Sequence, residues 1–391
     1  MDNTRLSDFD DIRPYEPSEM KQAFNDLIND RQFSLMLKGF VPWMPKGVRN
    51  GLLKLAFTGV KTPLDFQKRF MNPIVKYLIR KHTDGCTFDH SALSEQPTAD
   101  NKPLTARYTF LSNHRDIVLD SAFLDVMLIA SHYPTTVEIG IGDNLLIYPW
   151  IKRLVRMNKA FTVHRGLTAH EMLRSSQLMS SYIHYAVTQK HENIWLAQRE
   201  GRAKDSSDHT QDAVLKMLAM GGDLRELNII PLTISYEYDP CDYLKAQEFQ
   251  LKRDNPDYRK SRQDDLDNMK TGNVGYKGRV HYHCAPSVNT WIDELAEMPR
   301  NEYFASLSQR IDNELHRHYR LYPCNYIALD LLEGQRTYAE HYTPDDEKRF
   351  EQYLQGQLAK VTIPNADTAF LRERMLTMYA NPLRNYLKVK G

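Results

Sequence analysis

The chain has few cysteines and no long apolar run, and both features limit the classes of protein to which it can belong. Only four cysteines occur among 391 residues, widely separated and without a CxxC pair. We therefore expect reduced thiols in a cytoplasmic protein and no disulfide framework. No run of 18 apolar residues is present, so no membrane-spanning helix is predicted. The first residues, Met-Asp-Asn-Thr, are acidic, which is not typical of a signal peptide.

The chain also lacks a strong net charge, repeats and low-complexity tracts. It carries 51 basic and 50 acidic side chains, a net charge of +1, which disfavours a basic nucleic-acid-binding protein, and we expect no nucleic-acid partner. A hydrophobic content of 41% is enough for a sizeable core and excludes a disordered protein. The length fits one large domain with appendages, or two domains.

One segment is almost free of acids. Between Arg31 and Thr83 there are eleven Lys or Arg residues and a single acid, Asp65. Apolar and aromatic residues lie between these cations, and Pro and Gly divide the segment into short helical pieces. Such basic, apolar-faced helices predict peripheral contact with an anionic membrane surface, at its inner face. The alternative is an ordinary helical subdomain whose cations face solvent.

An alternation of strand-like and helix-like runs predicts the fold class. Strands are expected at residues 107–111, 136–141, 160–164, 193–197, 228–234 and 279–284. Helices are expected between them, at residues 121–131, 144–157, 168–189 and 210–220. This pattern predicts an α/β fold with a mostly parallel central sheet flanked by helices, and with helical N-terminal and C-terminal extensions.

We divide the chain into a helical region at 1–100, an α/β domain at 101–300 and a helical extension at 301–391. Residues 84–104, with Pro97 and Pro103, are predicted to be a polar connector. Residues 242–277 are charged and are predicted to be an exposed loop or helical excursion. A late helix over 367–380 should end before Pro382.

A histidine follows the first predicted strand of the α/β domain. His114 is succeeded by two acids, Asp116 and Asp120, within one or two helical turns. Histidine titrates near neutral pH, and a nearby carboxylate fixes its tautomer and supports its charged form. The pattern suits a His–Asp general base that activates a hydroxyl. The alternative is a helix-capping Asp beside an incidental His, and these residues alone favour the two interpretations equally.

Two more strand ends carry charge. Arg165 ends the strand at 160–164, and Arg presents donors suited to phosphate. After the strand at 193–197 come Glu200, Gly201, Arg202 and Lys204, a set suited to gripping an anion with backbone and cationic groups. The alternative for Arg165 is an ordinary strand end, since strands often end in Arg, and the alternative for the second set is a solvated turn with local ion pairs.

Two other strands are interpreted structurally. Pro231 lies inside an apolar run and cannot donate a ladder hydrogen bond, so that strand should bend, be interrupted or lie at an edge. His281 and His283 would share one face of a strand, but no second ligand cluster accompanies them. We therefore predict no metal site.

Taken together, four blocks resemble the glycerolipid acyltransferase superfamily, which includes glycerol-3-phosphate and lysophosphatidate acyltransferases. That family shows an Asn/Ser-His motif with a following Asp, a Phe-rich strand ending in Arg, a Glu-Gly block with Arg, and an Ile/Val-Pro-Val strand. The similar stretches here are Asn113-His114 with Asp120, residues 161–165, residues 200–202 and residues 230–232. They occur in the family's order, and the resemblance covers roughly residues 105 to 290.

The chain departs from the family pattern in two blocks. Asp120 falls six positions after His114 instead of five, and Leu119 takes the expected place. Either a one-residue bulge returns Asp120 to the dyad or Asp116 has taken its role; we favour Asp120. Arg199 precedes Glu200 where the family usually has Pro or another small or apolar residue, and Arg202 follows Gly201 directly.

The resemblance implies an O-acyltransferase of phospholipid biosynthesis. It would move a fatty acyl group from acyl-CoA or acyl-carrier protein to a hydroxyl of glycerol-3-phosphate or lysophosphatidate, without another cofactor. His114 would be the base and Asp120, or Asp116, its partner. The implied substrate-binding residues are Asn113, Arg165, Glu200, Gly201, Arg202 and Lys204. The alternatives are an acyltransferase for another acceptor, such as an amino-acid lipid, and a non-catalytic, membrane-associated lipid-binding scaffold.

Overall fold

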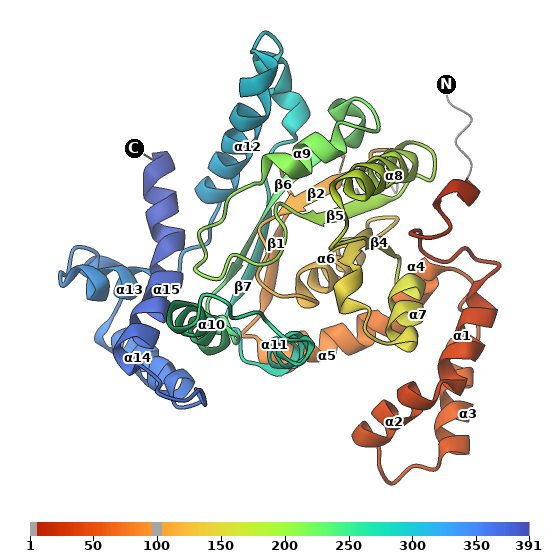
Figure 1. Cartoon of the computed structure of the whole chain (residues 1–391), viewed down its shortest axis with the longest axis horizontal. Coiled ribbons are helices and arrows are strands. Elements are labelled where there is room, and N and C mark those ends of the chain that lie inside the picture. Colours follow the sequence, from red (N-terminus) through yellow and green to blue (C-terminus); the bar gives the residue numbers. More distant parts are fainter. Residues whose placement is uncertain (1–5, 96–103, 391) are drawn as a thin grey trace.

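A seven-stranded sheet forms the centre of the molecule (Figure 1). The structure is a computed structural model and describes residues 6–95 and 104–390. The strand order is β1-β7-β6-β2-β5-β3-β4. The strands are β1 (Cys86–Asp89), β2 (Thr109–Ser112), β3 (Val137–Gly142), β4 (Ala160–Val163), β5 (Asn193–Ala197), β6 (Ile229–Tyr236) and β7 (Val280–Cys284). Helices flank the sheet, and the predicted fold class is confirmed.

The strand directions divide the sheet into two parts. Strands β6, β2, β5, β3 and β4 are mutually parallel, whereas β7 pairs antiparallel with β6 and parallel with β1. The six predicted strands are all present. The expectation of a connector over 84–104 is wrong where β1 forms; that strand is short and only half-buried at the sheet edge, so its pattern is weak. Pro97 and Pro103 lie outside the described residues.

The prediction that the strand would be interrupted at Pro231 or lie at a sheet edge is also wrong. Strand β6 is continuous and interior, between β7 and β2. Its pairing with β7 covers Leu232 to Tyr236 and stops beside Pro231. The Pro231 carbonyl still accepts a hydrogen bond from the amide of Ala285 at 2.9 Å. The missing N–H therefore removes one hydrogen bond at the end of the β6–β7 pairing, while the strand stays paired with β2 on its other side.

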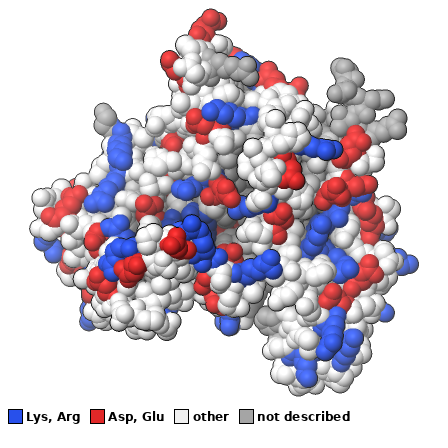
Figure 2. Space-filling view, viewed as in Figure 1, with Lys and Arg blue, Asp and Glu red and all other residues white. Residues whose placement is uncertain are grey.

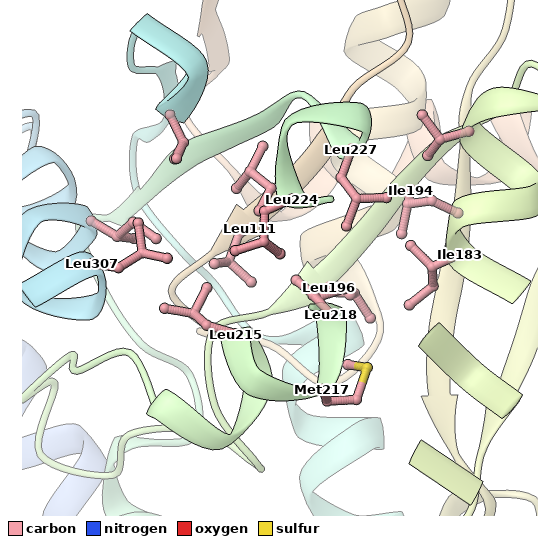
Figure 3. Close-up of a cluster of buried hydrophobic side chains, with 14 of the residues drawn as sticks. Leu111, Ile183, Ile194, Leu196, Leu215, Met217, Leu218, Leu224, Leu227 and Leu307 are labelled. Carbon is pink, nitrogen blue, oxygen red and sulfur yellow. The ribbon is translucent and has the colours of Figure 1, made fainter. Parts of the chain in front are cut away.

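Apolar side chains cover both faces of the sheet. On one face Leu111, Ile194, Leu196 and their neighbours pack under α8 (Ala169–Thr188), α9 (Asp212–Leu218) and α12 (Arg300–Arg317) (Figure 3). On the other face the strands pack against α5 (Asn72–His82) and α6 (Leu119–Ala130). Burial on both faces explains why the parallel strands are apolar runs without alternation.

The N-terminal helices form a smaller unit beside the sheet. They are α1 (Met20–Asn29), α2 (Arg31–Phe40), α3 (Lys46–Phe57) and α4 (Pro63–Phe66). Their core, in which Phe24 and Phe57 stack at 3.7 Å, also includes side chains of α7 (Pro149–Met157). In Figure 1, α2 and α3 project from the lower right of the molecule, away from the sheet.

The C-terminal helices α13 (Pro323–Glu333), α14 (Pro344–Leu358) and α15 (Thr368–Lys390) share an apolar cluster with α10 (Asp242–Asp254). Helix α11 (Arg262–Val274) follows α10 and contacts α5. One predicted boundary is wrong in this region. Helix α15 continues through Pro382 instead of ending before it. Tyr379, Ala380 and Leu383, on either side of the proline, are buried in one apolar cluster with α13 and α10. This packing offsets the roughly 3 kcal/mol that an interior proline costs a helix.

Candidate active site

The carboxyl ends of the parallel strands open into a polar cleft of about 590 Å³. His114 follows β2, Arg165 follows β4, and the loop of residues 199–205 follows β5, which lies between β2 and β3. Side chains from all three segments line the cleft. This is the edge of an α/β sheet at which ligands generally bind.

Asp120, and not Asp116, contacts the histidine. His114 Nδ1 lies 2.8 Å from Asp120 Oδ2. The same oxygen accepts the backbone N–H groups of Arg115 at 2.7 Å and Asp116 at 3.1 Å. The Asp120 side chain is fully buried, and that of His114 is 12% exposed. A carboxylate that accepts from Nδ1–H leaves the lone pair of the neutral imidazole on Nε2, which has no hydrogen-bond partner among the described residues.

Asp116 has a structural contact instead. Its Oδ1 accepts the backbone N–H groups of Val118 and Leu119, at 2.9 and 2.8 Å, where α6 begins. Its Oδ2 faces α11 so closely that a Cβ on Gly272 would come within 2.2 Å of it. Burial raises the pKa of Asp116 above its ordinary value, and the charge of Asp120 adds to this.

A buried ion pair fixes the loop that carries the histidine. The Arg115 guanidinium donates to Asp208 Oδ2 at 2.6 Å, and the Tyr319 hydroxyl donates to the same oxygen at 2.6 Å. Asn113 donates to Asp208 and exchanges hydrogen bonds with the backbone of Ile234 on β6. Asn113 is therefore fully buried and does not line the cleft, although the resemblance implied substrate contact.

Three of the five lysines and arginines that line the cleft have an acidic partner, and one of these, Lys260, pairs with Asp265 at 2.5 Å. Arg165 lies 3.3 Å from Glu200, and Lys204 forms an ion pair with Glu248 of α10. Burial lowers the pKa of Lys204 despite this partner. These pairs reduce the positive charge that the three side chains offer to a ligand.

Two arginines in the cleft lack such a partner. Arg202 donates to the amide oxygen of Asn268 at 2.8 Å, and within the described chain neither it nor Arg199 forms an ion pair. Arg199 Nε is buried without a hydrogen-bond partner. Beside them Gly201 adopts a left-handed φ of +70°, and in the part of the chain described here its N–H donates no hydrogen bond. This loop is the part of the cleft best suited to hold an anion.

Three residues near the dyad carry no signal in the sequence. Trp195 lies edge-on to the His114 ring, 5.7 Å between centroids. The Tyr236 hydroxyl donates to Asp120 Oδ1 at 3.1 Å, and the Tyr282 hydroxyl donates to the Asp120 carbonyl at 2.9 Å. They come from β5, β6 and β7, so only the strand order brings them to the site. No group of three or more potential metal ligands occurs among the described residues.

Comparisons with known proteins give matches among solved structures. No protein-family model matches the chain, and no curated protein matches it. The crystal structure of the 1-acyl-sn-glycerophosphate acyltransferase of Thermotoga maritima is similar in fold, with 10% sequence identity over 75% of this chain and 94% of that chain, and a TM-score of 0.38. This likeness is too distant to transfer the role of any residue.

Proposed function

We propose that the protein is an O-acyltransferase that moves a fatty acyl group from a thioester donor to a hydroxyl of glycerol-3-phosphate or lysophosphatidate. The observation that carries this proposal is the His114–Asp120 pair at the cleft. Nδ1 is held by a buried carboxylate, and Nε2 has no partner in the described chain. A histidine held in this way is a general base, a role that typically contributes ~10²–10⁴-fold to a rate.

The reaction needs no acyl-enzyme intermediate. His114 Nε2 takes the proton of the acceptor hydroxyl as its oxygen attacks the thioester carbonyl of acyl-CoA or acyl-carrier protein. Asp120 stabilises the imidazolium that forms. Collapse of the tetrahedral intermediate breaks the C–S bond, and the imidazolium returns the proton to the leaving thiolate. The products are an ester and a free thiol.

The phosphate of the acceptor would bind the loop after β5. Arg199, Arg202 and the N–H of Gly201 are the donors that carry no acidic partner in the described chain. Arginine suits phosphate because its planar fork donates two hydrogen bonds at once. We therefore propose that Arg199 and Arg202 bind the phosphate and that Lys204 contributes less to its binding. If the acceptor is an amino-acid lipid without phosphate, replacing these arginines by uncharged residues will change the rate of acyl transfer to it little.

We further propose that α2 and α3 contact a membrane surface. No helix in the described ranges is long and apolar enough to span a membrane. These helices and the turn between them instead expose large apolar side chains, including Trp43 of the turn at 76% and Leu55 of α3 at 71%. Lys38 and Lys54 are exposed on the same two helices. Figure 2 shows this lobe at the lower right as mainly white with several blue patches. Such a surface suits anionic lipid headgroups at the inner face of a membrane.

Radiolabelled acyl transfer tests the proposal. Purified protein is offered acyl-CoA and acyl-carrier protein, each with glycerol-3-phosphate, lysophosphatidate and a lyso-amino-acid lipid, in the presence of anionic vesicles. Lipid product that is lost in His114→Ala supports the proposal and identifies the acceptor. Folded protein that gives no product with any pair contradicts it and favours the lipid-binding scaffold. Product that persists in His114→Ala contradicts the assigned base.

A further inference from the structure

The buried carboxylate of the dyad has two oxygens, and they are held very differently. Oδ2 of Asp120 receives His114 Nδ1 and two backbone N–H groups. Oδ1 receives one donor among the described residues, the hydroxyl of Tyr236 at 3.1 Å. Because the Asp120 side chain is fully buried, water does not replace a donor that is lost there.

We propose that Tyr236 is a positioning residue for the His114–Asp120 pair. Its hydroxyl satisfies Oδ1 and, together with the backbone N–H groups at Oδ2, fixes the rotation of the carboxylate that presents Oδ2 to the imidazole. The inference rests on the proposed function, because the pair matters to turnover only if His114 is the base.

The surroundings of Tyr236 make it a rigid donor. It is the last residue of β6, which is paired with β2 on one side and β7 on the other. Its ring lies 6.4 Å from the ring of Phe123 on α6, the helix that also carries Asp120. From β7, the Tyr282 hydroxyl donates to the Asp120 main-chain carbonyl. The acid is thus held at its backbone and at its carboxylate by two neighbouring strands.

Removal of the hydroxyl leaves a buried charged acceptor without its donor. A hydrogen bond to a charged group is among the stronger ones in proteins, and an unsatisfied buried charge is costly. The carboxylate will then rotate toward another donor or take up a proton. Either response weakens the bond to His114 Nδ1–H, on which the tautomer of the base depends.

The test compares Tyr236→Phe with a matched control, Tyr182→Phe. Tyr182 is fully buried, and its hydroxyl, like that of Tyr236, donates to a buried carboxylate, that of Glu138 on β3, outside the cleft. We expect Tyr236→Phe to lower kcat by about 10- to 100-fold with little change in the KM of the acceptor. The control should keep the wild-type kcat.

Two further measurements separate positioning from a general structural effect. The downfield NMR signal of the His114 Nδ1 proton, assigned by its loss in His114→Ala, should weaken in Tyr236→Phe and not in the control. In an Asp120→Asn background, Tyr236→Phe should lower kcat much less than in the wild type. An unchanged NMR signal, or an equal loss of kcat in both backgrounds, overturns the proposal. If the wild type transfers no acyl group, the proposed function fails, and the NMR comparison still decides the role of Tyr236.

Discussion

Replacing Asp120 by Asn should separate the charge of the dyad from its geometry. In the Ser–His–Asp triad, an Asn in place of the Asp leaves the histidine in the wrong tautomer, because its amide can turn an N–H toward the ring. Here two backbone N–H groups, of Arg115 and Asp116, point at the oxygen that also binds His114. They would face the amide nitrogen unfavourably, so the amide oxygen should keep this position. The amide nitrogen would then donate to the Tyr236 hydroxyl.

The loss in Asp120→Asn is therefore mainly the loss of one negative charge. At 2.8 Å from Nδ1, a carboxylate attracts an imidazolium by ~6 kcal/mol at an effective dielectric constant of 20, and by ~1.5 kcal/mol in bulk water. Since His114 is only 12% exposed, the upper part of this range applies. We expect kcat to fall by about 10²- to 10⁴-fold.

The matched variant is Asp116→Asn. Its amide oxygen keeps the two hydrogen bonds to Val118 and Leu119, and Asp116 does not contact His114. We expect kcat to fall by less than about tenfold, and thermal unfolding should show both variants folded. A larger loss in Asp116→Asn than in Asp120→Asn would refute the assignment of Asp120.

Three other predictions concern separate parts of the molecule. Arg199→Gln should raise the KM of a phosphorylated acceptor by about 10- to 100-fold, and Lys204→Gln by less than threefold, since Glu248 already pairs with Lys204; equal effects would contradict this. Trp43→Ala should weaken sedimentation with anionic vesicles several-fold at low salt, without changing thermal unfolding. Burial raises the pKa of Asp242 from 3.8 to about 7, so the folded state binds an extra proton between these values and stability falls as pH rises through them. The free energy of unfolding of Asp242→Asn, measured in urea, should therefore rise relative to that of the wild type by up to about 4 kcal/mol between pH 4 and pH 8. A difference between the two proteins that stays constant with pH would contradict this.

The sequence predicted the parallel part of the sheet because those strands are long apolar runs between helices. Its errors have identifiable causes. Strand β1 is four residues long at a half-buried edge, so it lacks an apolar run. Pro231 and Pro382 were interpreted from local rules. Pro231 lies at the end of the β6–β7 pairing, where it costs one hydrogen bond without breaking the strand, and the packing of α15 offsets the cost of Pro382.

Only the part of the candidate site that lies close to the predicted strand ends in the sequence could be predicted. His114, Arg165 and the loop after β5 could be identified because they follow predicted strands, and parallel strands bring their carboxyl ends to one edge of the sheet. The charge state of that edge depends on residues far away in the chain. Glu248, which pairs with Lys204, lies in an insert that was predicted to be an exposed loop or helical excursion, and its helix packs on α15. Composition identified the cations but not which of them are neutralised.

The spacing of the two acids follows from the turn between β2 and α6. Asp116 binds the first N–H groups of the helix, which starts the helix at Leu119 and puts Asp120 in its first turn. The amides of Arg115 and Asp116 then converge on Asp120. The turn that Asp116 closes thus brings Asp120 to His114 Nδ1 across six positions of the chain. On this reasoning both acids are needed, Asp116 to shape the turn and Asp120 to hold the imidazole, and exchanging them would restore neither role.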